Sequence, residues 1–121
     1  MMYDIHAFDD RAFNEARKIM KHRFGDMVEC FLEDAEGYIA KIHEGFSSDD
    51  REMIAQYAHP LKSSSASLGL KGVSILARDM EMGAKDAIES GGSVEHLSTL
   101  APQIEQALQE GRVILGQKMH S

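Results

Sequence analysis

Residues 57–69 read YAHPLKSSSASLG, and this run predicts one helix with its apolar residues on one side. Side chains on an α-helix advance by about 100° per residue, so residues three and four apart share a face. The stripe formed in this way is Ile54, Tyr57, Leu61, Ser64 and Leu68. His59 falls roughly opposite the stripe, and we therefore expect its imidazole to face solvent.

The neighbours of His59 on the expected exposed face are small or polar. They are Ala55, Gln56, Lys62, Ser63 and Ala66. An exposed imidazole beside one cation suits a nucleophile that another protein must reach. We expect Ala55, Ser63 and Ala66 to form a flat landing surface for that partner. Without His59 and Lys62 beside them, the same small residues would be equally well explained as ordinary residues of a helix surface.

Pro60 follows the histidine directly and bears on whether this run is one helix or two. A proline inside a helix removes one hydrogen bond and clashes with the carbonyl four residues back, which here belongs to Gln56. Because Gln56 is expected on the exposed face, water can satisfy that carbonyl. The alternative is that Pro60 ends one helix and starts another. The apolar spacing continues in phase from Ile54 to Leu68 and favours a single helix, with a possible bend beside His59.

This run resembles the phosphoacceptor helix of histidine-containing phosphotransfer (HPt) domains of bacterial two-component phosphorelays. The family pattern is Ala-His-any-Leu-Lys-Gly-Ser-Ser, then two residues, then Leu-Gly. The matching positions are Ala58, His59, Leu61, Lys62, Ser64, Ser65, Leu68 and Gly69. Ser63 stands where glycine is usual, and Pro60 fills the variable position. Residues 31–35, FLEDA, also look like the family's sequence in the preceding helix, although more weakly.

The resemblance implies a phosphorelay intermediate that carries a phosphoryl group on Nε2 of His59. The group would be exchanged with the aspartate of a receiver domain, in a response regulator or a hybrid histidine kinase. A neutral imidazole is a good nucleophile near pH 7. Phosphoryl transfer also needs the charge on the phosphate oxygens neutralised, and Lys62 lies one helical turn from His59. Ser63 and Gln56 are candidate hydrogen-bond donors to the phosphate.

The chain is expected to be a phosphocarrier without kinase activity of its own. Its ten glycines are scattered, and no GxGxxG or Walker pattern occurs. No acidic cluster suits magnesium, so we expect no cofactor, and the resemblance implies that the receiver domain supplies the aspartate and Mg²⁺. No metal site is expected either, because HExxH and the Glu-x-x-His pairs of di-iron bundles are absent from the sequence.

Composition limits the possible partners and locations. The length of 121 residues indicates a single domain, residues 1–121. The net charge of −7 argues against nucleic acid or an anionic membrane as partner. The single cysteine, Cys30, excludes an internal disulfide, and its apolar neighbours suggest a core position. Neither a membrane-spanning stretch nor a signal-peptide pattern is present, so a cytoplasmic location is expected. The protein is expected to be a monomer, and dimerisation stays open because no spare apolar face is clear.

The remaining segments have helical periodicity without strand alternation, which predicts an all-α fold. Short connections favour an antiparallel up-and-down four-helix bundle, at about 26–118, with an additional N-terminal helix at about 9–23. Asp49, with Glu52 three residues on, is expected to cap the helix that Gly69 ends. Pro102 is expected to kink the last helix or to split off its first turn. The expected buried stripe of the helix over 26–44 is Met27, Cys30, Phe31, Ala35, Tyr38 and Ile42.

Two other classes of function stay open at this point. One is a non-phosphorylated four-helix interaction or adaptor domain of a signalling complex, for which the unusual Ser63 and Pro60 leave room. The other is a metal- or cofactor-binding bundle. His59 and Lys62, within the long pattern that they share with the phosphotransfer family, favour the phosphocarrier.

Overall fold

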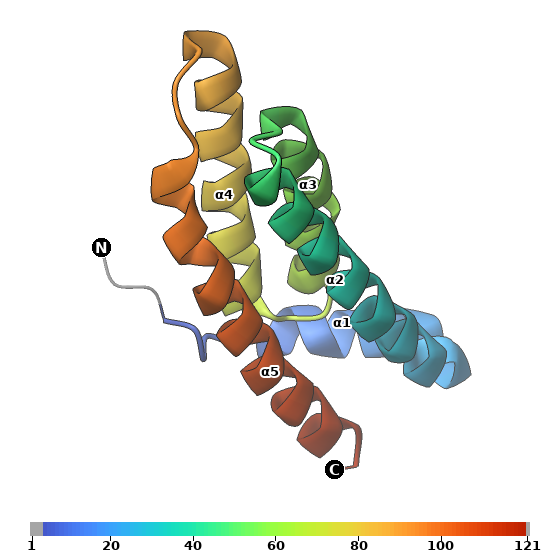
Figure 1. The fold of residues 1–121 in the computed structure, drawn as a ribbon. Coiled ribbons are helices and arrows are strands. Elements are labelled where there is room, and N and C mark those ends of the chain that lie inside the picture. The colour runs from blue at the N-terminus through green and yellow to red at the C-terminus, as the bar shows by residue number, and fades with distance from the viewer. Residues whose placement is uncertain (1–3, 121) are drawn as a thin grey trace.

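The computed structural model of the chain describes residues 4–120, and its regular elements are all helical. The elements are α1 (Asp10–Met20), the short 3-10 helix η1 (Lys21–Arg23), α2 (Phe24–Ser47), α3 (Arg51–Ser67), α4 (Lys71–Ser90), the 3-10 helix η2 (Glu95–Thr99) and α5 (Leu100–Met119). Helices α2 to α5 run alternately up and down, and α1 crosses one end of them (Figure 1). The predicted all-α four-helix bundle with an additional N-terminal helix is confirmed.

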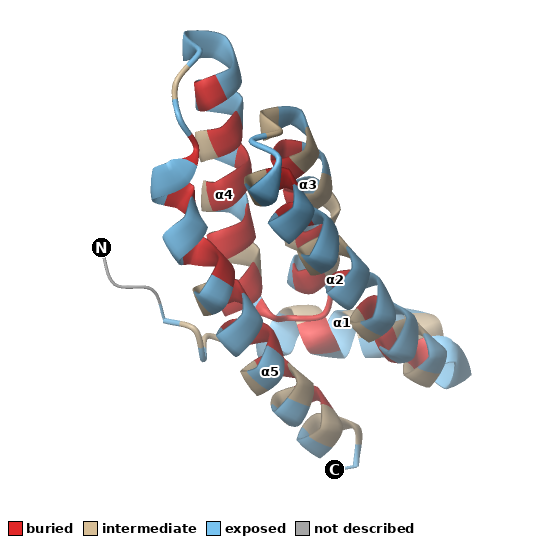
Figure 2. Cartoon of the chain, viewed as in Figure 1, coloured by how far each residue is buried: buried red, intermediate tan, exposed pale blue. Residues whose placement is uncertain are grey.

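The core lies between the four bundle helices, each of which turns its buried side inward (Figure 2). Contacts join α2 to α3, α3 to α4, α4 to α5 and α5 back to α2, so the helices form a closed ring. The fully buried side chains include Ile54 and Leu61 of α3, Leu76 and Met80 of α4, and Ile104 of α5. The α3–α4 seam is therefore opposite the α2–α5 seam.

The buried face of α2 differs from the predicted one. Phe31, Ala35 and Ile42 are buried as expected, but Cys30 is exposed, so its predicted core position is wrong. The stripe follows Val28, Phe31 and Ala35, and Cys30 lies about 200° around the helix from Val28. An apolar neighbour in sequence therefore says less about burial than the angular position does.

The ends of the helices are set by a few specific residues. Between α1 and α2 the chain changes direction at Lys21, which has a positive φ of 51°, and α2 begins directly after η1. The first turn of the last helix is split off as η2, as Pro102 suggested. After α3, Gly69 adopts φ +85°, the left-handed conformation that glycine tolerates best.

The N-terminal segment lies across the turn between α3 and α4. The Asp9 N–H donates to the carbonyl of Gly69 at 2.8 Å, and the Gly72 N–H donates to the carbonyl of Ala7 at 3.2 Å. A Cβ atom on Gly72 would lie 2.7 Å from the carbonyl oxygen of Ile5, so only glycine permits this close approach. The segment therefore fastens the end of the bundle where α3 and α4 meet.

Helix α3 is capped by Asp50 and not by Asp49, contrary to the sequence prediction. The Asp50 carboxylate accepts a hydrogen bond from the backbone N–H of Met53 at 3.0 Å. Asp49 has a positive φ of 52° and forms an ion pair with Arg51 at 3.5 Å. The cap lies one residue later than predicted because α2 continues to Ser47, beyond the end at about residue 44 that Gly45 suggested.

We expect Asp50→Ala to lower the free energy of unfolding by about 1 kcal/mol, because it removes the acceptor for a backbone N–H of the first turn. Asp49→Asn should change it by less than about 0.5 kcal/mol, since asparagine tolerates a positive φ and no cap is lost. Urea unfolding of both variants measures the difference. A larger loss for Asp49→Asn than for Asp50→Ala would contradict this assignment of the cap.

No helix within residues 4–120 has both the length and the apolar composition needed to cross a membrane.

Candidate functional site

Helix α3 runs without interruption through Pro60, as the phase of its apolar residues predicted. Ile54, Ala58 and Leu61 are fully buried and fix the rotation of the helix in the bundle. This rotation leaves the His59 side chain 59% exposed, which confirms the expected position of the imidazole. The histidine is therefore accessible on a helix whose opposite face is held firmly in the core.

Glu81 of α4 is the central group of the site. Its carboxylate receives three partners: Nδ1 of His59 at 2.8 Å, Nζ of Lys62 at 2.8 Å and Nζ of Lys85 at 3.0 Å. The Glu81 side chain is only 4% exposed, whereas the three partners reach it from the solvent side. One buried acidic group thus connects the exposed histidine to two lysines.

The three partners keep Glu81 ionised in spite of its burial. Burial raises its pKa, but the hydrogen bonds from Lys62, Lys85 and His59 outweigh burial and lower the pKa from 4.5 to about 2. An ionised carboxylate can only accept hydrogen bonds, so Nδ1 of His59 carries the proton in this contact. In the neutral ring, Nε2 then holds the lone pair, and Nε2 is the nucleophilic atom.

Two serines lie beside the site, one bonded within α3 and one that joins α4 to α3. The hydroxyl of Ser65, which is buried, donates to the carbonyl of Leu61 at 2.6 Å. The hydroxyl of Ser74 on α4 donates to the carbonyl of Lys62 at 3.0 Å. Ser65, and not the predicted Ser64, therefore lies on the buried face, and α4 is hydrogen-bonded to α3 at the level of Lys62.

Of the other predicted site residues on α3, three are exposed as expected and one is buried. Gln56, Ser63 and Ala66 are exposed as expected. The hydroxyl of Ser63 donates to the carbonyls of His59 and Pro60 at 3.4 and 3.3 Å, so it is turned along its own helix. Ala55 was expected on the exposed face, but it is only 8% exposed. Because α3 packs against both α2 and α4, its buried arc is wider than one stripe and includes Ala55.

The sequence interpretation missed Glu81 and Lys85. A signal was available, because Glu81 falls on the buried face of α4 that Ala77, Met80 and Ala84 define. A carboxylate at such a position is almost never buried unless a cation pairs with it, and Lys85 stands four residues on. Together with Gln56 and His59, these two residues line a shallow cleft at the α3–α4 seam.

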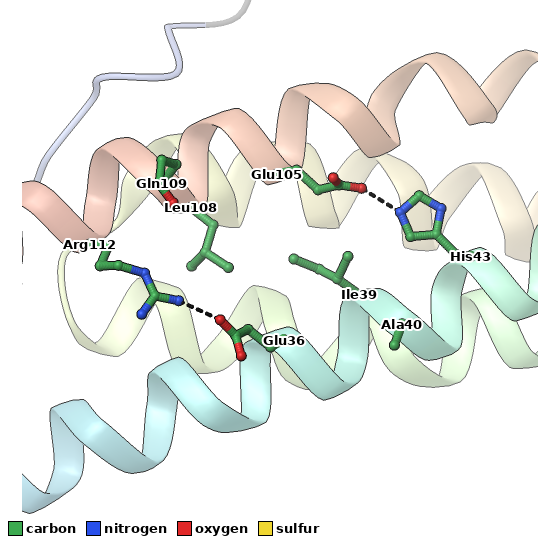
Figure 3. A pocket seen from close by; sticks show the side chains of 8 residues that line it. All are labelled: Glu36, Ile39, Ala40, His43, Glu105, Leu108, Gln109 and Arg112. Atoms are coloured by element: carbon green, nitrogen blue, oxygen red, sulfur yellow. Dashed lines mark hydrogen bonds and ion pairs between the residues drawn. The ribbon is translucent and has the colours of Figure 1, made fainter.

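A second hollow lies on the opposite side of the bundle, between α2 and α5 (Figure 3). Its apolar floor includes Ile39 and Leu108, and two ion pairs cross it. Glu36 pairs with Arg112 at 2.7 Å, and His43 pairs closely with Glu105. The polar groups that cross this hollow face one another, which suits a bridge between two helices better than a reactive site. Within residues 4–120 no group of three His, Cys, Asp or Glu side chains could hold a metal ion.

The model of the Hpt domain family matches residues 26–110. The chain belongs to the Hpt domain family. The match extends from α2 into α5 and includes the four residues that meet at the site, His59, Lys62, Glu81 and Lys85. None of the curated proteins matches the chain.

Solved structures share the fold of this Hpt domain over nearly its whole length. The histidine-containing phosphotransfer protein B (HptB) of Pseudomonas aeruginosa PAO1 is 19% identical, with a TM-score of 0.83 and 93% of each chain covered. A co-crystal structure of the Saccharomyces cerevisiae histidine phosphotransfer signaling protein Ypd1 and the receiver domain of its downstream response regulator Ssk1 gives 12% identity, a TM-score of 0.83 and 99% of each chain covered. The HPT domain of a sensor hybrid histidine kinase from Shewanella is 17% identical, with a TM-score of 0.73 and 97% of each chain covered.

Proposed function

We propose that this Hpt domain is a phosphorelay intermediate that carries a phosphoryl group on Nε2 of His59. It would exchange the group with the aspartate of a receiver domain, in a response regulator or a hybrid histidine kinase. The observation that carries the proposal is the 2.8 Å contact between Nδ1 of His59 and the ionised Glu81, which leaves Nε2 as the exposed nucleophile. Membership of the Hpt family and the likeness to Ypd1, which was crystallised with a receiver domain, support it.

The chemistry requires an in-line attack and neutralisation of the charge on the equatorial oxygens. Nε2 would attack phosphorus, and the ammonium groups of Lys62 and Lys85 lie close enough to the ring to turn toward the phosphoryl oxygens. Both ammonium groups already contact the Glu81 carboxylate that His59 contacts, Nζ of Lys62 at 2.8 Å and Nζ of Lys85 at 3.0 Å. We propose that the receiver domain contributes both the aspartate and Mg²⁺ to this step.

The partner would approach over the exposed residues around His59. Gln56, Ser63 and Ala66 are exposed on α3, and the side chains of Ser63 and Ala66 are short, so the imidazole is left accessible to a second protein. Ala55 contributes little surface because it is nearly buried. We also propose a cytoplasmic location, which the exposed and unpaired Cys30 supports, because free thiols are typical of reducing compartments.

The first experiment is phosphotransfer from a panel of phosphorylated receiver domains to the native chain and to His59→Gln. We expect an acid-labile, alkali-stable label on the native chain and none on His59→Gln. His96→Gln is the matched control, because His96 is also exposed but lies on η2, and it should be labelled like the native chain. Absence of label on the folded native chain with every donor would favour the adaptor function without phosphate.

Removal of either lysine should slow the transfer while leaving its site unchanged. A charge-assisted hydrogen bond contributes about 1.5–3 kcal/mol, so we expect Lys62→Ala and Lys85→Ala each to reduce the rate about 10- to 100-fold. Lys41→Ala is the control, because Lys41 pairs with Glu44 on α2 and should have no effect. Single-turnover kinetics with a phosphorylated receiver domain measure the rates, and unchanged rates for both variants would exclude these lysines from the reaction.

A further inference from the structure

Two hollows follow one another along the seam between α2 and α5. The hollow of Figure 3 has a volume of about 420 Å³, a second of about 430 Å³ continues toward the start of α2, and Arg112 lines both. On α2 the lining residues extend from Gly25 to His43, which is about 27 Å of helix. We call this surface the α2–α5 groove, and its length matches that of a partner helix of about 18 residues.

The floor of the α2–α5 groove is apolar. Val28 and Leu32 of α2 line one hollow, and Ile39 of α2 and Leu108 of α5 point into the other (Figure 3). Val28 and Leu108 are buried, whereas Leu32 and Ile39 are only partly buried, so some of this apolar surface is in contact with water. Removal of apolar surface from water is favourable in proportion to the area covered. A partner that fits the groove therefore has apolar side chains that reach the floor.

The rim of the groove is acidic. Its charged side chains are four carboxylates and one guanidinium, Asp26, Glu29, Glu36, Glu105 and Arg112. Glu36 pairs with Arg112, and Glu105 pairs with His43, but these four side chains are between 39% and 66% exposed. Exposed ion pairs contribute little to stability, so an entering cation can replace either partner. Asp26 and Glu29 form no ion pair within residues 4–120.

The charge and shape of the groove select among possible occupants. Its carboxylates repel nucleic acid and an anionic membrane. A second copy of the chain has the same net charge of −7 and the same acidic rim, so two grooves placed face to face repel each other. An apolar floor between charged rims is the shape that receives an amphipathic helix, and acidic rims favour basic side chains on that helix.

We propose that the α2–α5 groove binds a basic amphipathic helix of a partner protein. Apolar side chains spaced three and four apart would cover the floor, and lysine or arginine side chains would pair with the carboxylates of the rim. The groove lies on the opposite side of the bundle from the α3–α4 seam, so a helix bound there leaves His59 accessible. This docking goes beyond the proposed function and needs no phosphate on His59.

The experiment titrates the ¹⁵N-labelled chain with a synthetic 18-residue peptide of leucine and lysine, whose leucines recur three and four apart, and follows the backbone amides by NMR. We expect the largest shifts at residues that line the groove, including Ile39, Ala40 and Leu108. A peptide with glutamate in place of every lysine should not bind, because carboxylates would face carboxylates. A peptide with glutamine in place of every leucine should bind at least about 10-fold more weakly, because it cannot cover the floor.

Two lysine substitutions on α5 separate the groove from the overall charge. Gln109 lines the groove and Gln106 does not, and both side chains are exposed. Gln109→Lys and Gln106→Lys change the net charge equally, so any non-specific attraction for the leucine–lysine peptide falls equally in both. We expect Gln109→Lys to weaken its binding about 3- to 10-fold and Gln106→Lys to weaken it less than about 2-fold, because only the first places a cation in the groove.

Shifts centred on the groove, with the larger loss of affinity for Gln109→Lys, would support the docking site. Equal losses for the two variants, or shifts spread over the other acidic faces, would show attraction by net charge alone and overturn it. Binding of the leucine–glutamate peptide in the groove, or no binding of the leucine–lysine peptide, would overturn it too. Shifts of the groove residues when the chain alone is concentrated would assign the groove to a second copy instead, and so would also overturn it.

Discussion

Ile54→Ala should lower the free energy of unfolding by about 2–5 kcal/mol, the usual cost of truncating a fully buried isoleucine. Ile54 is 0% exposed and lies where α3 meets α2. A Cβ atom on Gly45 of α2 would come within 2.9 Å of its Cγ1, so the two helices approach closely at this point. The truncated side chain would leave a cavity that the neighbouring backbone cannot collapse to fill.

Ile19→Ala is the matched control, because the same atoms are removed from a side chain that is 72% exposed. We expect a change of less than about 0.5 kcal/mol. Urea unfolding followed by circular dichroism measures both variants, with the slope of the transition checked for two-state behaviour. Similar losses at the two positions would mean that α3 is not anchored through Ile54.

The native chain should lose about 3 kcal/mol of stability through Glu81 alone when the pH falls from about 6 to below 2. The pKa of Glu81 is lowered from 4.5 to about 2, so the folded state binds its proton less readily than the unfolded state does. The stabilisation is therefore fully present above about pH 5, declines as the unfolded chain takes up the proton, and is lost as the pH passes below about 2.

Glu81→Gln removes this titration while retaining a hydrogen-bond acceptor of similar size. The difference in free energy of unfolding between the native chain and this variant should therefore shrink as the pH falls from 6 to 2. Other carboxylates titrate equally in both proteins and cancel in the difference. Parallel curves for the two proteins over this range would show that Glu81 does not have a lowered pKa.

The sequence was sufficient for the features that depend on one helix. The rotation of α3 followed from residues three and four apart, and it placed His59 on the exposed side correctly. The burial of Ala55 and the exposure of Cys30 did not follow from such a pattern. A helix that packs against two neighbours buries a wider arc than one stripe, and residues beside an apolar run in sequence can point away from the core.

The second half of the site could not be obtained in the same way. Glu81 and Lys85 stand on a different helix, and only the packing of α4 against α3 brings them to His59. A glutamate on the buried face of α4 with a lysine four residues on indicates a paired charge. It does not indicate which residue of another helix the glutamate contacts. The tautomer of His59 depends on this contact, and so it too required the structure.

The position of the site on consecutive helices has a consequence for how the chain folds. The contacts of Glu81 with Lys62 and His59 span 19 and 22 residues of sequence, whereas those of Arg112 with Glu36 and of Lys118 with Asp10 span 76 and 108. Closing a shorter loop costs less chain entropy, and local contacts form faster than distant ones. The imidazole of His59 and the carboxylate of Glu81 thus belong to a more local part of the topology than those two ion pairs. They can meet before the two ends of the chain have docked, and fraying of those ends need not separate them.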